Sequence, residues 1–193
     1  MRKIVSLKNE LIAYLDVTST QNSYSIYASD INGNSVGKCL FNIDYVITRK
    51  LTDKERELYA RNHKIPLSEV PTKIKSKPEG IEKYFSEGRK TITLANGKEY
   101  CIEEIKCSLL QIEILDERFF GVGLGQAMHD EMLDIAKKYN CTKIHAFCYP
   151  HGNFLFGTQA FYKRNGYSFS TEGGMTYVTR NLSKENCLHE NIK

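Results

Sequence analysis

The stretch RFFGVGLGQAMHDEMLDIAKKY, from Arg118 to Tyr139, decides the fold of this chain. Glycine occupies positions 121, 123 and 125, and the apolar residues that follow recur at the spacing of a helix. Glycine costs a helix roughly 0.5–1 kcal/mol relative to alanine, so three of them at a helix entrance require a reason. They permit a tight turn and leave backbone N–H groups bare. Because the first N–H groups of a helix carry partial positive charge, this corner predicts a site for an anion, with a pyrophosphate as its natural guest.

A glycine-rich turn that binds nothing is the plainer interpretation of the same residues. Two common nucleotide-binding motifs do not fit. A P-loop needs Gly-Lys-Ser/Thr, whereas Gly125 is followed by Gln126 and Ala127. A dinucleotide fingerprint needs an acid at the end of the next strand, which here ends in Tyr149-Pro150. The stretch therefore predicts either a simple turn or a phosphate site of another kind.

Strands and helices alternate around this stretch. Residues 107–115, CSLLQIEIL, predict a strand whose positions 110, 112 and 114 form an apolar face, while Gln111 and Glu113 project from the opposite face. After the helix, the sequence predicts a strand, a second helix and two closing strands at residues 142–149, 156–165, 167–170 and 175–180. From residue 107 onward the predicted order is therefore strand, helix, strand, helix, strand, strand.

The first half of the chain predicts strands with one interruption. Residues 10–46 are rich in aromatic and β-branched residues, and residues 90–106 form a hairpin around Asn96-Gly97. Between them, residues 49–90 form an insertion with a helix at 52–64. This insertion holds 12 Lys and Arg against 7 Asp and Glu, so its charge of +5 exceeds the +4 of the whole chain. The basicity is therefore concentrated there.

The bulk composition excludes several classes of protein. The chain has 193 residues, 41% hydrophobic and 26% charged, which suits one globular domain over residues 1–193 with a polar tail at about 182–193. No apolar run approaches the roughly 20 residues that cross a bilayer. Lys8 and Glu10 interrupt the apolar residues of the N-terminus, so we expect no secretory leader, no membrane association and a cytoplasmic location. Six cysteines without a C-x-x-C pair predict reduced thiols and no metal site.

The strand 107–115, the turn FFGVGLGQAM and the segment AFYKRNGYSF together resemble the GNAT superfamily of acyl-CoA-dependent N-acyltransferases. The pyrophosphate loop of that family has the pattern Gln/Arg-x-x-Gly-x-Gly/Ala. Gly123-Leu124-Gly125 matches its second half, while Phe120 stands at its first position and Arg118 lies nearby as a substitute charge. The family's second signature, aromatic-Tyr-x-x-x-Gly-aromatic, is matched by residues 161–167. The resemblance covers residues 107–180, and residues 10–46 more loosely.

The resemblance implies a mixed α/β (α+β) GNAT fold, with a central twisted sheet of about six to seven strands, flanking helices and the basic insertion. It implies an N-acetyltransferase that moves an acetyl group from acetyl-CoA to an amine by direct attack, without a metal. The pantetheine arm would bond to the backbone of the strand before the glycine turn. The residues implied to bind acetyl-CoA are Glu113, Ile114, Leu115, Gly121, Val122, Gly123, Leu124, Gly125, Gln126, Asn153 and Tyr162. Asn153 lies nine residues before Tyr162, whereas the family's asparagine often precedes that tyrosine by seven.

Two residues are the candidates for proton transfer. Tyr162 falls on the position that often protonates the leaving thiolate, although a helix tyrosine also packs its ring into a core. Glu113 is the candidate base, acting through water because a free glutamate has a pKa of only about 4.3. A solvated strand acid is its plainer role. His145 and His151 are further base candidates, and Cys148 is a weaker candidate for a nucleophile.

Several questions stay open at this point. The rival hypothesis is a GNAT domain that holds acyl-CoA or a partner without turnover. Phe120 and Asn153 support it, because both positions depart from the family's pattern. The acceptor could be a small amine, a polyamine, an aminoglycoside, a protein lysine or N-terminus, or an aminoacyl-tRNA. The insertion at 49–90 suits a mobile cover over the acceptor, a patch for an acidic partner such as a nucleic acid, or a solvated elaboration. A homodimer is compatible with the sequence.

Overall fold

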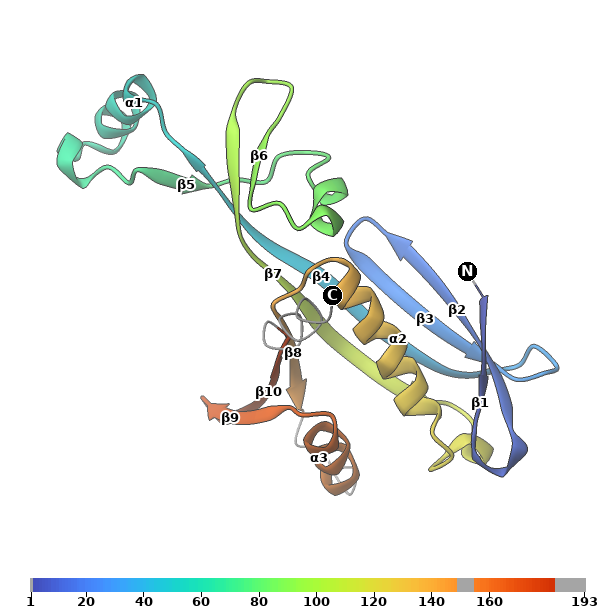
Figure 1. Ribbon diagram of the computed structural model, residues 1–193. Helices are drawn as coiled ribbons and strands as arrows, with labels where there is room; N and C mark the ends of the chain where they lie inside the picture. Colours follow the sequence, from blue (N-terminus) through green and yellow to red (C-terminus); the bar gives the residue numbers. More distant parts are fainter. Residues whose placement is uncertain (1, 149–154, 183–193) are drawn as a thin grey trace, which may run out of the picture. The chain divides into compact units, whose positions relative to one another are not determined.

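A computed structural model describes residues 2–148 and 155–182 of the chain (Figure 1). These residues separate into two compact units, Met1–Asp44 with Lys106–Lys193 as unit 1 and Tyr45–Ile105 as unit 2. In the described ranges the strand order is β1-β2-β3-β4-β7-β8-β10-β9, with β5 paired to β4 and β6 paired to β7. The strands β4 and β7 run through both units, and the predicted insertion lies inside unit 2.

Unit 1 is an α/β layer around a mostly antiparallel sheet. Its strands are β1 (Arg2–Ser6), β2 (Ile12–Thr20), β3 (Ser23–Ser29), the first part of β4 (Ser35–Lys50), the last part of β7 (Glu99–Ile114), β8 (Lys143–Cys148), β9 (Ser168–Glu172) and β10 (Met175–Asn181). The pair β7–β8 is parallel, whereas β1–β2, β2–β3, β3–β4, β8–β10 and β9–β10 are antiparallel. Parallel neighbours need a crossover connection, which the intervening helix supplies.

Two helices cover one face of the unit 1 sheet. They are α2 (Leu124–Lys138) and α3 (Leu155–Arg164), and short 3₁₀ turns at Lys8–Glu10 and Glu117–Phe119 flank the strands. The apolar stripe of α2 is fully buried at Leu124, Met128 and Met132, as its periodicity predicts. On the opposite face Tyr27 and Phe147, which alternate with buried strand residues, stay 46% exposed. The core of unit 1 therefore lies between the sheet and this helix layer.

Free thiols lie in this core. Cys39, Cys107 and Cys141 are buried. Burial raises the pKa of Cys39 and of Cys141 to about 12, and burial beside these two thiols raises the pKa of Cys107 well above its usual value. The three sulfurs are therefore held as neutral thiols.

The strand β7 is longer than the sequence predicted, and its side-chain alternation changes phase. The predicted hairpin strand and the predicted strand 107–115 are one continuous strand. Ile105, Cys107 and Leu109 are buried on alternate positions, but Ile112 and Ile114 then lie on the helix side, beside Gly125. The prediction that position 110 belongs to the apolar face is therefore wrong, because Leu110 is 57% exposed. One extra residue shifts the period-2 pattern, as at a β-bulge.

Unit 2 has a small core of its own. It contains the helix α1 (Asp53–His63), 3₁₀ turns at Leu67–Glu69 and Glu82–Glu87, the strands β5 (Lys73–Lys75) and β6 (Thr91–Thr93), and the remaining parts of β4 and β7. The buried side chains are Ile47, Leu51, Val70, Ile81, Phe85, Ile92, Tyr100 and Ile105. The predicted α1 is confirmed with its capping box, in which Thr52 Oγ1 accepts from the Glu55 N–H and the Glu55 carboxylate accepts from the Thr52 N–H.

Gly37 of β4 allows α2 to approach the sheet closely, and this contact is open to test. A Cβ at this position would lie 3.1 Å from the Glu113 carbonyl oxygen and 3.2 Å from Met128 Cε. We expect Gly37→Ala to lower the free energy of unfolding by about 1–3 kcal/mol, because the Glu113 backbone has to move. Gly125→Ala is the control, since its Cβ would meet Ile114 Cδ1 at an ordinary 3.7 Å. Equal midpoints in urea for the two variants would contradict this account.

The capping box of α1 predicts a pH dependence. The pKa of Glu55 is lowered to about 2, first by the Arg49 guanidinium and then by the Thr52 N–H. A depressed folded-state pKa gives stability that is present above the usual value near 4.5 and is lost as the pH falls toward 2. The protection factors of the α1 amides against hydrogen exchange should therefore fall over this window in the wild type. In Glu55→Gln the same window should show a flatter dependence; an unchanged dependence would assign the effect to other carboxylates.

Candidate active site

The glycine turn opens onto free space at the entrance of α2. Gly121 and Gly123 have φ values of +71° and +106°, and a Cβ built on either would meet no atom within 4 Å. The Ala127 N–H is bonded to the Gly123 oxygen at 2.9 Å, so the N–H groups of Leu124, Gly125 and Gln126 precede the helical ladder. Gly121 and Gly123 thus form a backbone cradle that a side chain would fill. Gly125 differs from these two glycines, because a Cβ there would meet Ile114 Cδ1 at an ordinary 3.7 Å.

The backbone, rather than a side chain, supplies the positive potential here. The first turn of α2 holds no acid, so its dipole is not offset locally. Arg118, suggested by the sequence as a substitute charge, donates to Asp116 and lies 3.4 Å from the buried Asp30 carboxylate. These carboxylates already neutralise its charge, and the neighbouring carboxylates raise the pKa of Arg118. The Lys8 N–H holds the turn from outside by donating to the Val122 oxygen at 3.0 Å.

An opening between β7 and β8 begins close to this turn. The two strands are paired from Lys106↔Lys143 to Leu109↔Ala146, and β7 continues to Ile114 without this partner in the described residues. The Leu115 N–H is bonded to the Val36 oxygen of β4 at 2.9 Å. Because successive residues of a strand present their backbone groups to opposite sides, the Ile114 N–H and C=O face the edge that β8 has left. Of the three predicted backbone positions, Ile114 is the one oriented for an extended ligand arm there.

Glu113 is ion-paired rather than free. Its carboxylate lies 3.0 Å from Lys38 Nζ and accepts a hydrogen bond of 3.0 Å from Gln111 Nε2. Its side chain is 40% exposed, on the sheet face opposite to α2. Because Lys38 and Gln111 already contact this carboxylate, Glu113 suits a base that works through water.

Tyr162 is buried near the end of α3. It is 8% exposed, and its ring packs edge-on against Tyr167 at a centroid distance of 5.1 Å. Side-chain contacts tie this part of the chain to α2. Among them, Gln126 Nε2 donates to Asn165 Oδ1 at 2.8 Å, and His129 Nε2 lies 2.9 Å from the Tyr167 hydroxyl. The sequence missed the buried His129–Tyr167 pair, because its apolar spacing marked only Leu124, Met128, Met132 and their repeats. Burial lowers the pKa of His129, so this histidine is neutral.

His145 lies where the β7–β8 pairing ends. It is opposite Ser108, one pair before the last, and its ring stacks on Tyr177 at 5.6 Å. Its Nδ1 lies 3.3 Å from Thr179 Oγ1. Burial, followed by the positive charges of Lys106 and Lys143, lowers its pKa. A histidine that is neutral at pH 7 can accept a proton, which keeps His145 in the set of base candidates.

Some predicted site residues lie outside the described part of the chain. These are Asn153, His151 and the side chain of Cys148. Among the described residues there is no group of three or more His, Cys, Asp or Glu side chains placed to hold a metal ion. None of the described helices is both long enough and apolar enough to cross a bilayer.

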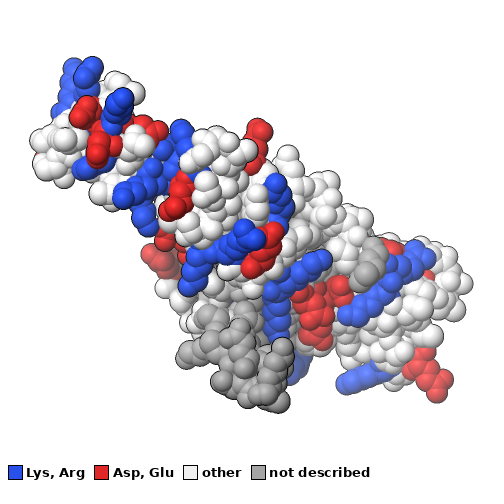
Figure 2. Space-filling model, turned by 45° about the horizontal axis from the view of Figure 1, so that its top comes forward, with Lys and Arg blue, Asp and Glu red and all other residues white. Residues whose placement is uncertain are grey.

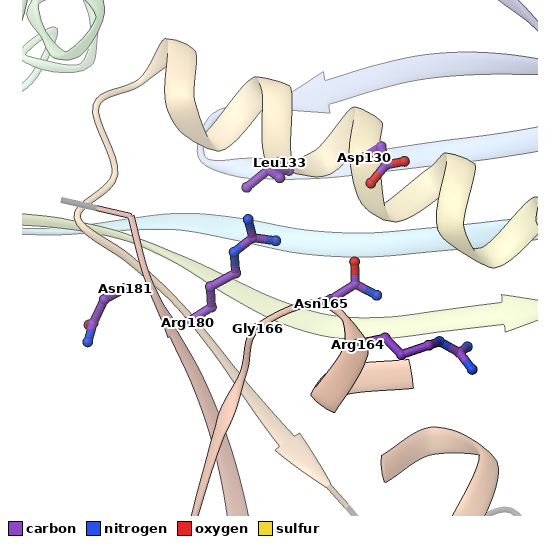
Figure 3. Close-up of a pocket in the computed structure, with 7 residues that line it drawn as sticks. All are labelled: Asp130, Leu133, Arg164, Asn165, Gly166, Arg180 and Asn181. Atoms are coloured by element: carbon purple, nitrogen blue, oxygen red, sulfur yellow. The ribbon is translucent and has the colours of Figure 1, made fainter. Parts of the chain in front are cut away.

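A separate hollow lies on the flank of α2, away from the glycine turn. Figure 3 shows its lining residues, which are Asp130, Leu133, Arg164, Asn165, Gly166, Arg180 and Asn181. The cavity has a volume of about 430 Å³. In this view the Arg180 side chain rises toward α2, whereas the Arg164 side chain points away from it. Because the two guanidinium groups do not converge, the hollow lacks the geometry of a built anion site.

The comparisons with known proteins concern the fold. No family model and no curated protein matches the sequence. Among solved structures, the GNAT domain of S. lividans PAT is similar with a TM-score of 0.52 and 9% identity, over 94% of this chain and 97% of that domain. The PaiA N-acetyltransferase of Thermoplasma acidophilum, solved with coenzyme A, gives 0.44 and 13%, over 83% of this chain and 62% of that one. A GNAT family acetyltransferase of Elizabethkingia anophelis with acetyl-CoA bound gives 0.43 and 13%, over 84% and 78%.

The likeness with a TM-score above 0.5 defines the fold class of the chain. The similarity to the S. lividans GNAT domain extends over nearly the whole of both chains. The mixed sheet, the parallel β7–β8 pair and the crossover helix α2 agree with it. The chain has the GNAT fold, and this prediction from the sequence is confirmed.

The cradle predicts the effect of a side chain at Gly123. We expect Gly123→Val to abolish binding of acetyl-CoA, because the valine would occupy the open space in front of the amides. Calorimetry measures this affinity directly. Gly97→Val is the matched control, since Gly97 also has a positive φ (+72°) and open space around it but lies in the unit 2 hairpin. A folded Gly123→Val protein with wild-type affinity would remove the turn from the site.

Proposed function

We propose that this protein is an N-acetyltransferase that transfers an acetyl group from acetyl-CoA to an amine by direct attack in a ternary complex. The observation that carries the proposal is the cradle of Gly121 and Gly123 at the start of α2. It lies at the carboxyl end of β7, next to the edge that β8 leaves after Leu109. A bare helix N-terminus suits a pyrophosphate, and an unpaired strand edge suits a chain of amides such as the pantetheine arm.

The residues for binding follow from this placement. The N–H groups from Gly121 to Gln126 would hold the pyrophosphate, and the Ile114 backbone would bond to the pantetheine amides. Glu113 and Leu115 flank that contact. The resemblance adds Asn153 and the Tyr162 hydroxyl near the sulfur. Gln126 contributes through its backbone, because its side chain is engaged with Asp130 and Asn165.

The chemistry requires two proton transfers. The amine nitrogen attacks the thioester carbonyl carbon, the C–S bond breaks, and the sulfur leaves as a thiolate. Tyr162 would give its hydroxyl proton to that thiolate, as a general acid placed beside it. The amine proton would pass to Glu113 through water. His145 is the second candidate for this role, because its lowered pKa leaves it unprotonated near pH 7.

The rival function is a GNAT domain that binds acyl-CoA without turnover. Two features favour this rival. Phe120 stands where the family's pyrophosphate loop has Gln or Arg, and Lys38 holds the Glu113 carboxylate that would act as the base. A thiol-release assay with acetyl-CoA and a panel of amines separates the two. Amine-dependent release of free CoA supports the transferase. CoA affinity without release under any amine supports the binder.

Removing the Tyr162 hydroxyl tests the general acid. Tyr162→Phe should lower turnover by about 10²–10⁴-fold, or about 3–5 kcal/mol of transition-state stabilisation, while acetyl-CoA affinity stays nearly the same. Tyr167→Phe is the matched control, because it removes a neighbouring buried hydroxyl that bonds to His129. We expect the control to lose stability but to keep turnover. A Tyr162→Phe enzyme within about threefold of wild type would mean that water or another group protonates the sulfur.

The pH profile distinguishes the two base candidates. Glu113→Gln preserves the shape of the side chain and should flatten the acidic limb of kcat/KM, because an amide cannot accept the amine proton. His145→Gln should leave that limb in place. The reverse pattern would transfer the role to His145, with a limb below the usual value of 6.5. No change in either variant would leave proton removal to solvent.

A further inference from the structure

Four lysines share one face of the unit 2 sheet. The register of β4 and β5 places Lys50 directly opposite Lys73, and Thr48 directly opposite Lys75. The Ser76 N–H bonds to the Ile47 oxygen at 2.9 Å, so the alternation continues to Lys77. Residues opposite each other in an antiparallel pair, and residues two apart on one strand, lie on the same side. We call Lys50, Lys73, Lys75 and Lys77 the lysine face; all four are exposed.

One acid accompanies this cluster. Glu103 accepts from Lys73 Nζ at 3.1 Å and from Thr48 Oγ1 at 2.7 Å, and these contacts lower its pKa. Among the described side chains, no carboxylate lies within ion-pair distance of Lys50, Lys75 or Lys77. The four lysines and Glu103 therefore leave a net charge of +3 on a few residues of sheet. Like charges directly opposite each other, as at Lys50 and Lys73, destabilise a sheet, so a counter-charge would be favourable.

Protection of a strand edge explains only part of this arrangement. Short edge strands often carry lysines that discourage pairing with another chain, and β5 is a three-residue strand paired to β4. Lys50, however, lies on β4, which has β5 on one side and β7 on the other. An interior strand has no free edge to protect. Protection of a strand edge therefore does not explain the exposed lysine at position 50.

The spacing of the lysines indicates the kind of counter-charge. Alternate residues of a strand are about 6.6–6.8 Å apart, so Lys73, Lys75 and Lys77 form an evenly spaced row of point charges. An even row suits a polymer that repeats its negative charge, rather than one small anion. Figure 2 shows Lys and Arg side chains over this part of unit 2, with Asp and Glu side chains among them.

We propose that the lysine face binds the phosphate backbone of a single nucleic-acid strand. A phosphodiester chain supplies one charge per nucleotide at regular intervals, whereas an acidic peptide would need carboxylates clustered by its sequence. The contact is electrostatic, so it carries no sequence preference of its own. It uses residues of unit 2 alone and does not depend on the acetyltransferase proposal.

Salt dependence gives a quantitative test. The variant Lys50→Gln/Lys75→Gln/Lys77→Gln removes three charges and leaves the Lys73–Glu103 ion pair in place. The control Lys90→Gln/Lys138→Gln/Lys163→Gln removes three exposed lysines outside the face and changes the net charge equally. Fluorescence anisotropy of a labelled single-stranded RNA, and of a DNA of the same sequence, is followed from low to physiological salt. Thermal melting verifies that both variants are folded.

The wild-type protein should bind at low salt, and its log K should fall linearly with log salt. Each phosphate neutralised on a single strand contributes about 0.7 to that slope, so the lysine-face variant should lose about 2 units of slope. The control should keep the wild-type slope. Absence of binding at low salt, or an equal loss in the control, would overturn the proposal. Tighter binding of poly-glutamate than of RNA would also overturn it and would assign the face to an acidic protein.

Discussion

The parallel pairing of β7 with β8 is the constraint on which the rest of unit 1 depends. Parallel neighbours cannot be joined by a tight turn, so the chain must cross back over the sheet, and α2 makes this crossover. The crossover has to begin at the carboxyl end of β7, which fixes where the N-terminus of α2 can lie. Ligand sites of open α/β sheets lie outside the carboxyl ends of parallel strands for the same reason. The glycine turn occupies this one place.

The β7–β8 pairing is short, and this limits how α2 can pack on the sheet. The β7–β8 ladder ends at Leu109, and the side chains of β7 change phase immediately afterwards, so that Ile112 and Ile114 turn toward α2. The helix can then approach the sheet only where side chains are missing. Gly37 provides that room on the strand side. The same close approach brings the free amides of α2 next to the open strand edge.

Local signals in the sequence were enough to predict the individual elements. The Thr52–Glu55 capping box and the apolar stripe of α2 are local patterns, and both have the predicted conformation. The two GNAT motifs are also short, and the fold that they predicted is the observed one. The continuity of β7 was missed although no turn residue separates Lys106 from Cys107. The sequence predicted one strand that pairs in the hairpin and another that leads to the glycine turn. It did not show that these two segments are a single strand.

Contacts between distant residues could not be predicted in this way. Lys38 and Glu113 are far apart in the chain, and their ion pair depends on the register of two strands that no local pattern specifies. In the sequence Arg118 looked like an unpaired charge, because one of its partners, Asp30, belongs to the distant β3–β4 connection. His129 was overlooked because a buried histidine requires a particular partner, here the Tyr167 hydroxyl contributed by the segment after α3. The sequence thus predicted the backbone of the candidate site, but not the partners of its charged and polar side chains.

The three buried thiols have a consequence for the lifetime of the protein. Oxidants and disulfides react with the thiolate, and in the folded core Cys39, Cys107 and Cys141 are neither ionised nor accessible. They become reactive only in the small fraction of molecules whose sheet has opened. Oxidation there would place a polar or bulky sulfur group at positions of 0% or 1% exposure, which prevents the core from closing again. In an oxidising environment the rate of opening, rather than the equilibrium stability, would therefore set how long this protein survives.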